Sequence, residues 1–185
     1  MFPTPSLLRA VITAWLLLLP ACEVNADMFG LFAKKYDVHL SPAVNGRVTN
    51  NGQPVAGLTL KRALKYGDLY TDEATTDNNG EFHFAERNIR SRLPGGAFTG
   101  DTKVIQSIMA IHQGQEYAIW YTSQIGLTPN QALTRRLLLL HCDLTVAEAK
   151  FYFKSMETDV LSHTVVSICR WPFGPKPNDL DDDWK

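Results

Sequence analysis

Short runs of alternating apolar and polar residues, separated by turns rich in glycine and asparagine, constrain the fold of this chain more than any other feature. After the Asn-Gly pair at residues 79–80, Phe82 and Phe84 alternate with Glu81 and His83. Successive side chains of a strand point to opposite faces, so both phenyl rings are predicted to face inward. Asn-Gly between two extended runs is also a strong hairpin signal, because both residues tolerate a positive φ angle.

Most of the remaining chain follows the same pattern of apolar runs bounded by Gly, Pro, Asn or Asp. A short helix is predicted with Thr128 as N-cap and Pro129 as its first residue. Residues 87–101 contain Pro94 and several glycines, which predicts a long irregular connection. The predicted hairpins join residues 45–49 with 55–64 and residues 104–112 with 117–122. Further strands are predicted over 70–76, 82–84, 150–154 and 163–171. Residues 136–144 could continue the helix or form a strand through Cys142, and the strand is preferred.

The composition is that of an ordinary globular protein. The chain has 185 residues, of which 45% are hydrophobic and 20% are charged, and this length is enough for one sizeable core. Its formal net charge is -1. Nucleic acid is therefore not an expected partner, since phosphate binding requires a concentrated basic surface.

The N-terminus carries a predicted export signal. Residues 1–26 combine one positive charge, an apolar run and a small residue, Ala26, before a cleavage point. A competing interpretation is a lipoprotein signal that ends at residue 21, with Cys22 lipidated as a membrane tether. Translation from Met28 would instead leave the protein in the cytoplasm. We expect export to the periplasm, a domain over residues 27–174 and a flexible acidic tail over 175–185.

Two cysteines remain in the chain after cleavage of the signal. An even pair in an oxidising compartment predicts a disulfide between Cys142 and Cys169. The closed loop of about 27 residues would stabilise the fold by roughly 3 to 4 kcal/mol in the chain-entropy model. Two free buried thiols are the alternative. Neither cysteine has a CxxC or papain-like context, so catalysis and metal binding are not expected of them.

The sequence contains no recognisable catalytic or cofactor motif. The five histidines form no HExxH or other tight ligand pair, and the Asp-Asn-Asn-Gly stretch at 77–80 lacks the ligand spacing of an EF-hand. A GxSxG nucleophile elbow, a P-loop and a dinucleotide fingerprint are also missing. We therefore expect a protein that is not an enzyme and that requires no metal and no other cofactor.

Two segments carry a specific resemblance. NGRVTNNGQPVAGLTL and EATTDNNGEFHF, within residues 44–84, resemble the carboxypeptidase regulatory-like, transthyretin-like group of domains. This resemblance implies a mainly β fold, an antiparallel Greek-key β-sandwich with one short helix and no catalytic site of its own. It also implies that Gly46, Gly57 and Gly80 occupy turns or close-packed positions.

With the opening MFGLFAKKYDVHLSP and the later SICRW, the whole chain is similar to a family of small proteins of Gram-negative bacteria. That family includes immunity partners of type VI secretion effectors, some of them phospholipase-type toxins. The resemblance implies neutralisation of a cognate toxin by direct binding. The alternative is a periplasmic carbohydrate-binding or envelope-adhesion module, in which exposed Trp120 and Tyr121 would stack on a sugar. For these two residues, alternating core and surface positions of one strand are the preferred interpretation.

The predicted partner-binding surface is the connection over residues 87–101. It presents Arg90, Arg92 and Phe98, and arginine and aromatic side chains most often dominate binding energy at protein interfaces. The acidic residues 179–183 of the tail are a second candidate. Exposed charge mainly changes the association rate, so the connection is preferred.

Overall fold

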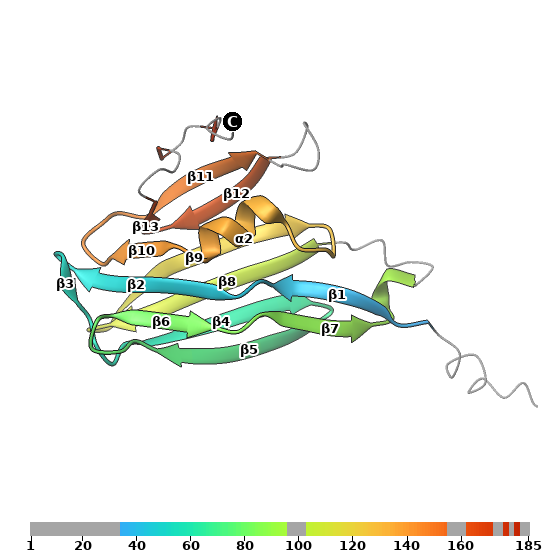
Figure 1. The fold of residues 1–185 in the computed structure, drawn as a ribbon, viewed down its shortest axis with the longest axis horizontal. Coiled ribbons are helices and arrows are strands. Elements are labelled where there is room, and N and C mark those ends of the chain that lie inside the picture. Colours follow the sequence, from blue (N-terminus) through green and yellow to red (C-terminus); the bar gives the residue numbers. More distant parts are fainter. Residues whose placement is uncertain (1–33, 96–102, 155–161, 172–175, 178–179, 182–185) are drawn as a thin grey trace, which may run out of the picture. The chain divides into compact units, whose positions relative to one another are not determined.

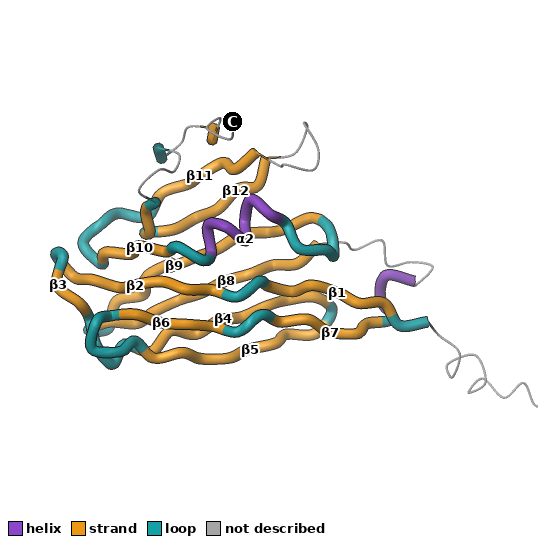
Figure 2. Tube along the Cα trace, viewed as in Figure 1, coloured by secondary structure: helices purple, strands orange, loops and turns teal. Residues whose placement is uncertain are grey.

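The computed structural model describes residues 34–95, 103–154, 162–171, 176–177 and 180–181, and these are mainly β (Figure 2). One α-helix, α2 (Gln131–Leu137), and one 3-10 turn, η2 (Leu93–Gly95), occur among them. None of the helical segments described is long and apolar enough to cross a bilayer. The strands are β1 (Tyr36–Ser41), β2 (Val44–Asn50), β3 (Gln53–Pro54), β4 (Thr59–Tyr66), β5 (Asp68–Thr75), β6 (Glu81–Phe84), β7 (Arg87–Ser91), β8 (Lys103–His112), β9 (Gln115–Ile125), β10 (Leu140–Asp143), β11 (Ala149–Lys154), β12 (Ser162–Ser167), β13 (Cys169–Arg170) and β14 (Leu180–Asp181).

The strands form two layers, which confirms the predicted β-sandwich. One layer is a seven-stranded sheet in the order β14-β11-β12-β9-β8-β4-β5. The other layer contains a five-stranded sheet, β13-β10-β2-β3 with β6 also paired to β2, and a two-stranded sheet of β1 and β7. In Figure 1, β1 and β2 follow one another along one line, and β6 and β7 follow one another along a second. Most pairs are antiparallel, but β2 with β10 and β11 with β14 are parallel.

Both turns near the start of the domain form as predicted, but the first hairpin is wrong. The chain turns after β2 and pairs back only through the two residues of β3. It then crosses to the seven-stranded sheet, where β4 pairs with β5 and β8. The hairpin indicated by Asn79-Gly80 is also wrong, because the turn at residues 77–80 connects β5 in one layer to β6 in the other. Crossing lets the apolar faces of both layers bury against each other, which a simple hairpin of these strands would not do.

The turn at residues 77–80 has the predicted chemistry. The Asp77 carboxylate accepts hydrogen bonds from the backbone N–H groups of Asn79 and Glu81. Gly80 has a φ angle of 76°, and a Cβ atom there would lie 2.3 Å from the Val48 carbonyl oxygen. Phe82 is buried, as is Phe84, so the predicted inward face of this strand is confirmed.

The second hairpin is confirmed, with a shorter loop than predicted. Strands β8 and β9 pair along their length, and only Gln113 and Gly114 connect them. Both residues have positive φ angles, 52° and 82°, as in the type I′ turns that suit two-residue hairpins. Helix α2 begins after Asn130 rather than Thr128, because the Asn130 side chain accepts the hydrogen bond from the Leu133 N–H.

The segment predicted as an irregular connection over residues 87–101 begins with a regular strand. Residues 87–91 form β7, which pairs with β1, so the prediction is wrong for this half of the segment. Ile89 packs against the core from β7, and this burial favours a strand at residues 87–91 although turn-forming residues follow it. Of the predicted tail, β14 pairs with Tyr152 and Phe153 of β11.

Candidate functional site

The outer face of the five-stranded sheet gathers charged and polar side chains from four strands. On β2, Val44 and Val48 are buried, so the alternate residues point away from the core. The strand register places Glu81 of β6 and His141 of β10 on either side of Arg47. We call this surface the β2 face and define it by seven residues: Asn45, Arg47, Thr49, Glu81, His83, His141 and Arg170.

One row of the β2 face runs across all four strands. Arg170 of β13 pairs with His141 of β10, His141 pairs with Arg47 of β2, and Arg47 pairs with Glu81 of β6. Adjacent strands lie about 4.8 Å apart, so neighbouring side chains in this row can act on the same group of a partner. These residues are up to 123 positions apart in sequence (170 − 47 = 123), and only the sheet brings them together.

Two depressions mark the β2 face, and both are lined by Arg47 and His141. The larger has a volume of about 720 Å³ and is also lined by Leu138 and Leu139. The smaller has a volume of about 310 Å³ and extends to Arg170. Leu139 is 61% exposed, so apolar and cationic contact surfaces adjoin each other.

Arg170 is held in place by the backbone. Its guanidinium donates to the carbonyl groups of Ile168, Cys169 and Ala147, and it lies 5.1 Å from the centre of the Phe151 ring. Burial lowers the pKa of Arg170, but an arginine keeps its charge at neutral pH. Arg47 is more exposed, and its Nε donates to the Asn79 carbonyl over 2.8 Å.

Asp143, at the edge of the β2 face, is saturated with hydrogen bonds. Its carboxylate accepts from the Thr49 hydroxyl, from the Asn51 and Gly52 N–H groups, and from both the N–H and the hydroxyl of Thr145. Partial burial raises the pKa of Asp143, but the bonds from Thr145, Gly52 and Thr49 together lower it well below its usual range. The carboxylate therefore fixes the turn between β2 and β3.

The predicted disulfide is confirmed, and it joins the residues next to His141 and Arg170 in the row. Cys142 and Cys169 are directly paired residues of β10 and β13, and their Cα atoms are 3.9 Å apart. The bond thus ties the strand that carries Arg170 to the strand that carries His141. Both sulfur-bearing residues are buried, so the bond belongs to the core and not to the exposed surface.

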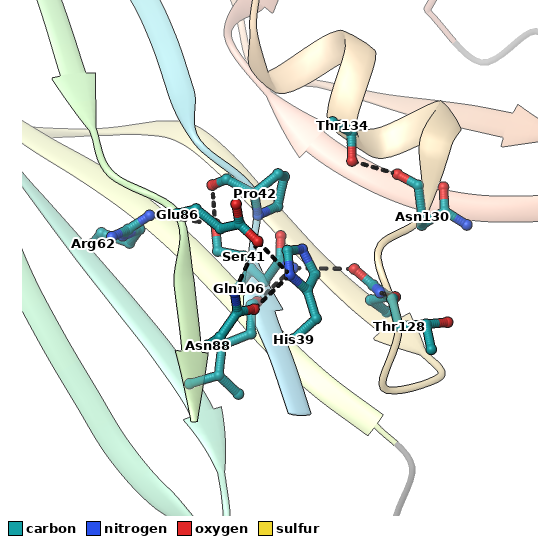
Figure 3. A network of polar contacts seen from close by, with 12 residues as sticks. His39, Ser41, Pro42, Arg62, Glu86, Asn88, Gln106, Thr128, Asn130 and Thr134 are labelled. Carbon is teal, nitrogen blue, oxygen red and sulfur yellow. Dashed lines mark hydrogen bonds and ion pairs between the residues drawn. The ribbon is translucent and has the colours of Figure 1, made fainter. Parts of the chain in front are cut away.

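A second polar cluster lies inside the other end of the domain (Figure 3). His39 Nδ1 lies 2.8 Å from Asn88 Oδ1 and 3.4 Å from Glu86 Oε1. Gln106 donates to the Leu40 carbonyl and to the side chain of Gln124. His39 and Gln106 are 5% and 2% exposed, so a partner could not reach them without opening the fold. We interpret this cluster as structural.

Of the residues predicted to bind the partner, Arg90 and Arg92 line neither depression. Arg90 is exposed on β7, and its Nε is 3.4 Å from Asp37 Oδ1. Arg92 is exposed just beyond β7, and Phe98 lies outside the described residues. Ile89 faces the core, so its neighbour Arg90 points outward from the same layer as the β2 face. The role of Arg90, Arg92 and Phe98 stays a prediction.

The sugar-stacking pair of the carbohydrate-binding alternative is wrong, and the preferred interpretation of Trp120 and Tyr121 as alternating core and surface positions is confirmed. Trp120 is fully buried in the core, whereas Tyr121 is 46% exposed. Consecutive residues of a strand face opposite sides of the sheet, so the two rings cannot form one platform.

The β2 face was not predicted. Alternation in NGRVTN does indicate an outward Arg47, but nothing local in the sequence indicates that β10 lies parallel beside β2. Within the described residues, no group of three or more His, Cys, Asp or Glu side chains is placed to hold a metal ion.

Comparison with known families places this surface within a recognised unit. A family model described as Domain of unknown function (DUF6795) matches residues 44–147. The chain belongs to the DUF6795 family. The DUF6795 region runs from β2 to the turn after β10, so it supplies all of the β2 face except Arg170. No curated protein and no solved structure matches the chain.

Proposed function

We propose that this chain is a non-enzymatic protein-binding domain that neutralises a type VI secretion toxin by direct binding. The observation that carries the proposal is the β2 face, where fixed arginines adjoin exposed leucines around shallow depressions. Arginine is among the residue types that dominate protein interfaces, and apolar side chains supply the surface that is buried around it. The resemblance to the immunity family of Gram-negative bacteria supports the choice of a toxin as the partner.

The way the arginines are held favours binding. A guanidinium already fixed by carbonyl groups, as in Arg170, loses little conformational freedom when a partner docks. The segment SICRW, on which part of the resemblance rests, contains Arg170 itself. One segment thus contributes Arg170 to the β2 face and also carries part of the resemblance to the immunity family.

A toxin is expected to cover more than the two depressions, since stable protein complexes bury about 1,600 Å² in total. Strand β7 continues the line of β6 in Figure 1, and Arg90 points outward from that layer. We propose the β2 face as the main contact and Arg90 with Arg92 as a peripheral contact.

We place this function in the periplasm. The Cys142–Cys169 disulfide supports an oxidising compartment. Residues 1–26, with the proposed signal and the alternative lipidation site Cys22, lie outside the described residues. Intact-mass measurement of the envelope fraction should give a chain that starts at Asp27, or one with a lipidated Cys22. A cytosolic product that starts at Met28 would contradict the proposed location.

Protection of cells tests the function. The protein encoded by the adjacent open reading frame, the candidate toxin, is expressed in the periplasm with and without the chain, and survival is counted. Wild-type chain should restore survival, and the purified pair should bind in calorimetry. Arg47→Gln combined with Leu139→Asp should weaken binding at least tenfold. Arg90→Ala with Arg92→Ala should weaken it only a few-fold.

Thermal unfolding of each variant provides the control, since all four positions are exposed and the fold should be kept. A wild-type chain that neither binds nor protects would remove the proposed function. Loss of protection by the Arg90 and Arg92 variant alone would move the contact surface to β7.

A further inference from the structure

The smaller depression on the β2 face has the chemistry of an anion site. Its volume of about 310 Å³ lies between Arg47 on β2 and Arg170 on β13, with His141 on the strand between them. Two strand spacings of about 4.8 Å place the two arginine Cα atoms about 10 Å apart. From that separation the long side chain of Arg47 can contact a negatively charged group in the depression, while Arg170 adds a fixed positive charge.

The acidic residue that lines this depression, Asp143, offsets one of the two arginine charges, so the depression keeps an excess of positive charge. Within the described residues it forms an ion pair with neither arginine. Asp143 accepts five hydrogen bonds, all from the turn at Asn51–Gly52, from Thr49 and from Thr145. A carboxylate offers about four lone-pair positions, so its acceptor capacity is used. Glu81 lies on the far side of Arg47 and lines only the larger depression.

Donors remain available for a ligand. Only the Nε of Arg47 has a hydrogen bond within the described residues, and this leaves its terminal amino groups for the ligand. Arg170 uses its NH1 and NH2 atoms on carbonyl groups, so it acts mainly as a fixed positive charge. Arg47 is therefore the residue suited to a two-pronged contact, the geometry that arginine forms with a carboxylate.

We propose that the pocket formed by Arg47, His141 and Arg170 receives an aspartate or glutamate side chain of the partner protein. The adjoining larger depression favours a protein carboxylate over a free anion, because Leu138 and Leu139 can contact apolar atoms next to the acidic side chain. This inference rests on the proposed function, since it names the chemistry of the contact that the toxin makes.

The first test needs no toxin. The ¹⁵N-labelled protein, purified as it is produced by the cell, is titrated with the capped peptide acetyl-Gly-Asp-Gly-amide while NMR shifts are followed. The matched peptide acetyl-Gly-Asn-Gly-amide has the same shape without the charge. We expect saturable shifts at Arg47 and His141 with the aspartate peptide and at least tenfold weaker binding of the asparagine peptide.

The choice of variants keeps this test free of folding effects. Arg170→Ala would remove a cap from several carbonyl groups, so Arg47→Gln, at an exposed residue, is the informative change. It should weaken aspartate-peptide binding at least tenfold. Lys65→Gln, an exposed cation on β4 in the other layer, should leave it unchanged.

Equal shifts with both peptides would overturn the proposal. Inorganic phosphate as a third probe separates the sources of negative charge: binding of phosphate without binding of the aspartate peptide would also overturn it. In the toxin experiment, an Arg47→Gln variant that protects cells as well as the wild type does would contradict the proposed contact with an acidic side chain and leave the proposed function standing. A toxin that fails to bind the wild-type chain would remove the proposed function, whatever the peptide result.

Discussion

The two hydrophobic clusters of this sandwich differ in size and in the residues that fill them. The large cluster lies under the five-stranded sheet and α2, and Trp171 packs edge-on against Phe151, Phe153 and Trp120. The small cluster lies under β1 and β7, and it is built from Val38, Leu40, Leu64, Tyr66 and Val104.

A polar layer of Ser41, Arg62 and Gln106 separates the clusters. Strand β4 contributes Leu60 to the large cluster and Leu64 to the small one, with Arg62 between them on the same face. Arg62 is 1% exposed, donates to both carboxylate oxygens of Asp72 and lies 4.8 Å from the centre of the Phe84 ring.

The two ends of the sandwich are therefore held together differently. The large apolar cluster, which includes the disulfide, packs beneath the β2 face. The other end has a smaller apolar cluster, bordered by the hydrogen-bonded polar layer. Regions with fewer apolar contacts open at a lower free energy. We therefore expect β1 and β7 to exchange amide hydrogens before β9 and β12 do.

Truncation of the large cluster should have the largest effect on stability. Leu60→Ala in the large cluster should lower the free energy of unfolding by about 4 kcal/mol, whereas Leu64→Ala in the small cluster should lower it by about 2 kcal/mol. Both residues are at most 2% exposed, so the contrast reports on the surrounding packing. Urea denaturation measures both values. Equal losses would contradict the comparison between the clusters.

Loss of the disulfide comes next. Replacing Cys142 and Cys169 together by alanine should lower the free energy of unfolding by about 3.5 kcal/mol, because the unfolded chain is no longer constrained. Thermal unfolding of the wild type should likewise show a lower melting temperature with reductant than without it. If the variant is as stable as the oxidised wild type, the disulfide does not stabilise the part of the sandwich that contains the large cluster.

A pair of changes at Arg62 tests the polar layer. Arg62→Ala leaves Asp72 without its partner and opens space beside Phe84, so stability should fall by about 2 kcal/mol. Arg62→Met fills that space with an apolar chain that can join the two clusters, and its loss should be smaller by about 1 kcal/mol. Denaturant titration distinguishes the two variants. A methionine variant that is the less stable of the two would show that the ion pair, and not packing, holds this layer.

The smallest effect concerns pH. The pKa of Asp143 is lowered in the folded state, so its contribution to stability is complete above the unfolded pKa of about 4 and is lost progressively as the pH falls toward the folded pKa. Asp143→Asn should therefore be less stable than the wild type at pH 7. Melting temperatures from pH 7 down to pH 2.5 should converge below pH 4. A gap that stays constant with pH would mean that the charge of Asp143 contributes nothing.

Much of the local structure could be predicted from the sequence. The strand predicted over 136–144 is wrong at its start, because residues 136–137 end α2, and β1 and β7 were not predicted. Most of the other strands, the inward phenyl rings of Phe82 and Phe84, the short helix and the Cys142–Cys169 disulfide are confirmed. These features depend on the period of a strand, on turn chemistry or on the number of cysteines. The first hairpin and the irregular connection over residues 87–91 are wrong, because both required knowledge of which distant strand each segment pairs with.

The candidate site shows the same limit. Alternation alone places Arg47 outward from β2, but His141 and Arg170 reach its neighbourhood only through the parallel pairing of β10 and the short strand β13. Likewise, period two indicates that Arg62 shares a face with Leu60 and Leu64, yet it does not indicate that this face is buried at all three positions.

The sequence by itself determined the two faces of each strand, the positive-φ turns and the cysteine pair, because dihedral preferences and side-chain alternation act over a few residues. Only the tertiary structure decided which layer each strand joined, and therefore where the β2 face and the polar layer lie. Burial of apolar area is non-directional and acts between segments far apart in sequence, so the crossing from β3 to β4 follows from the packing of the whole sandwich and not from the turn that precedes it.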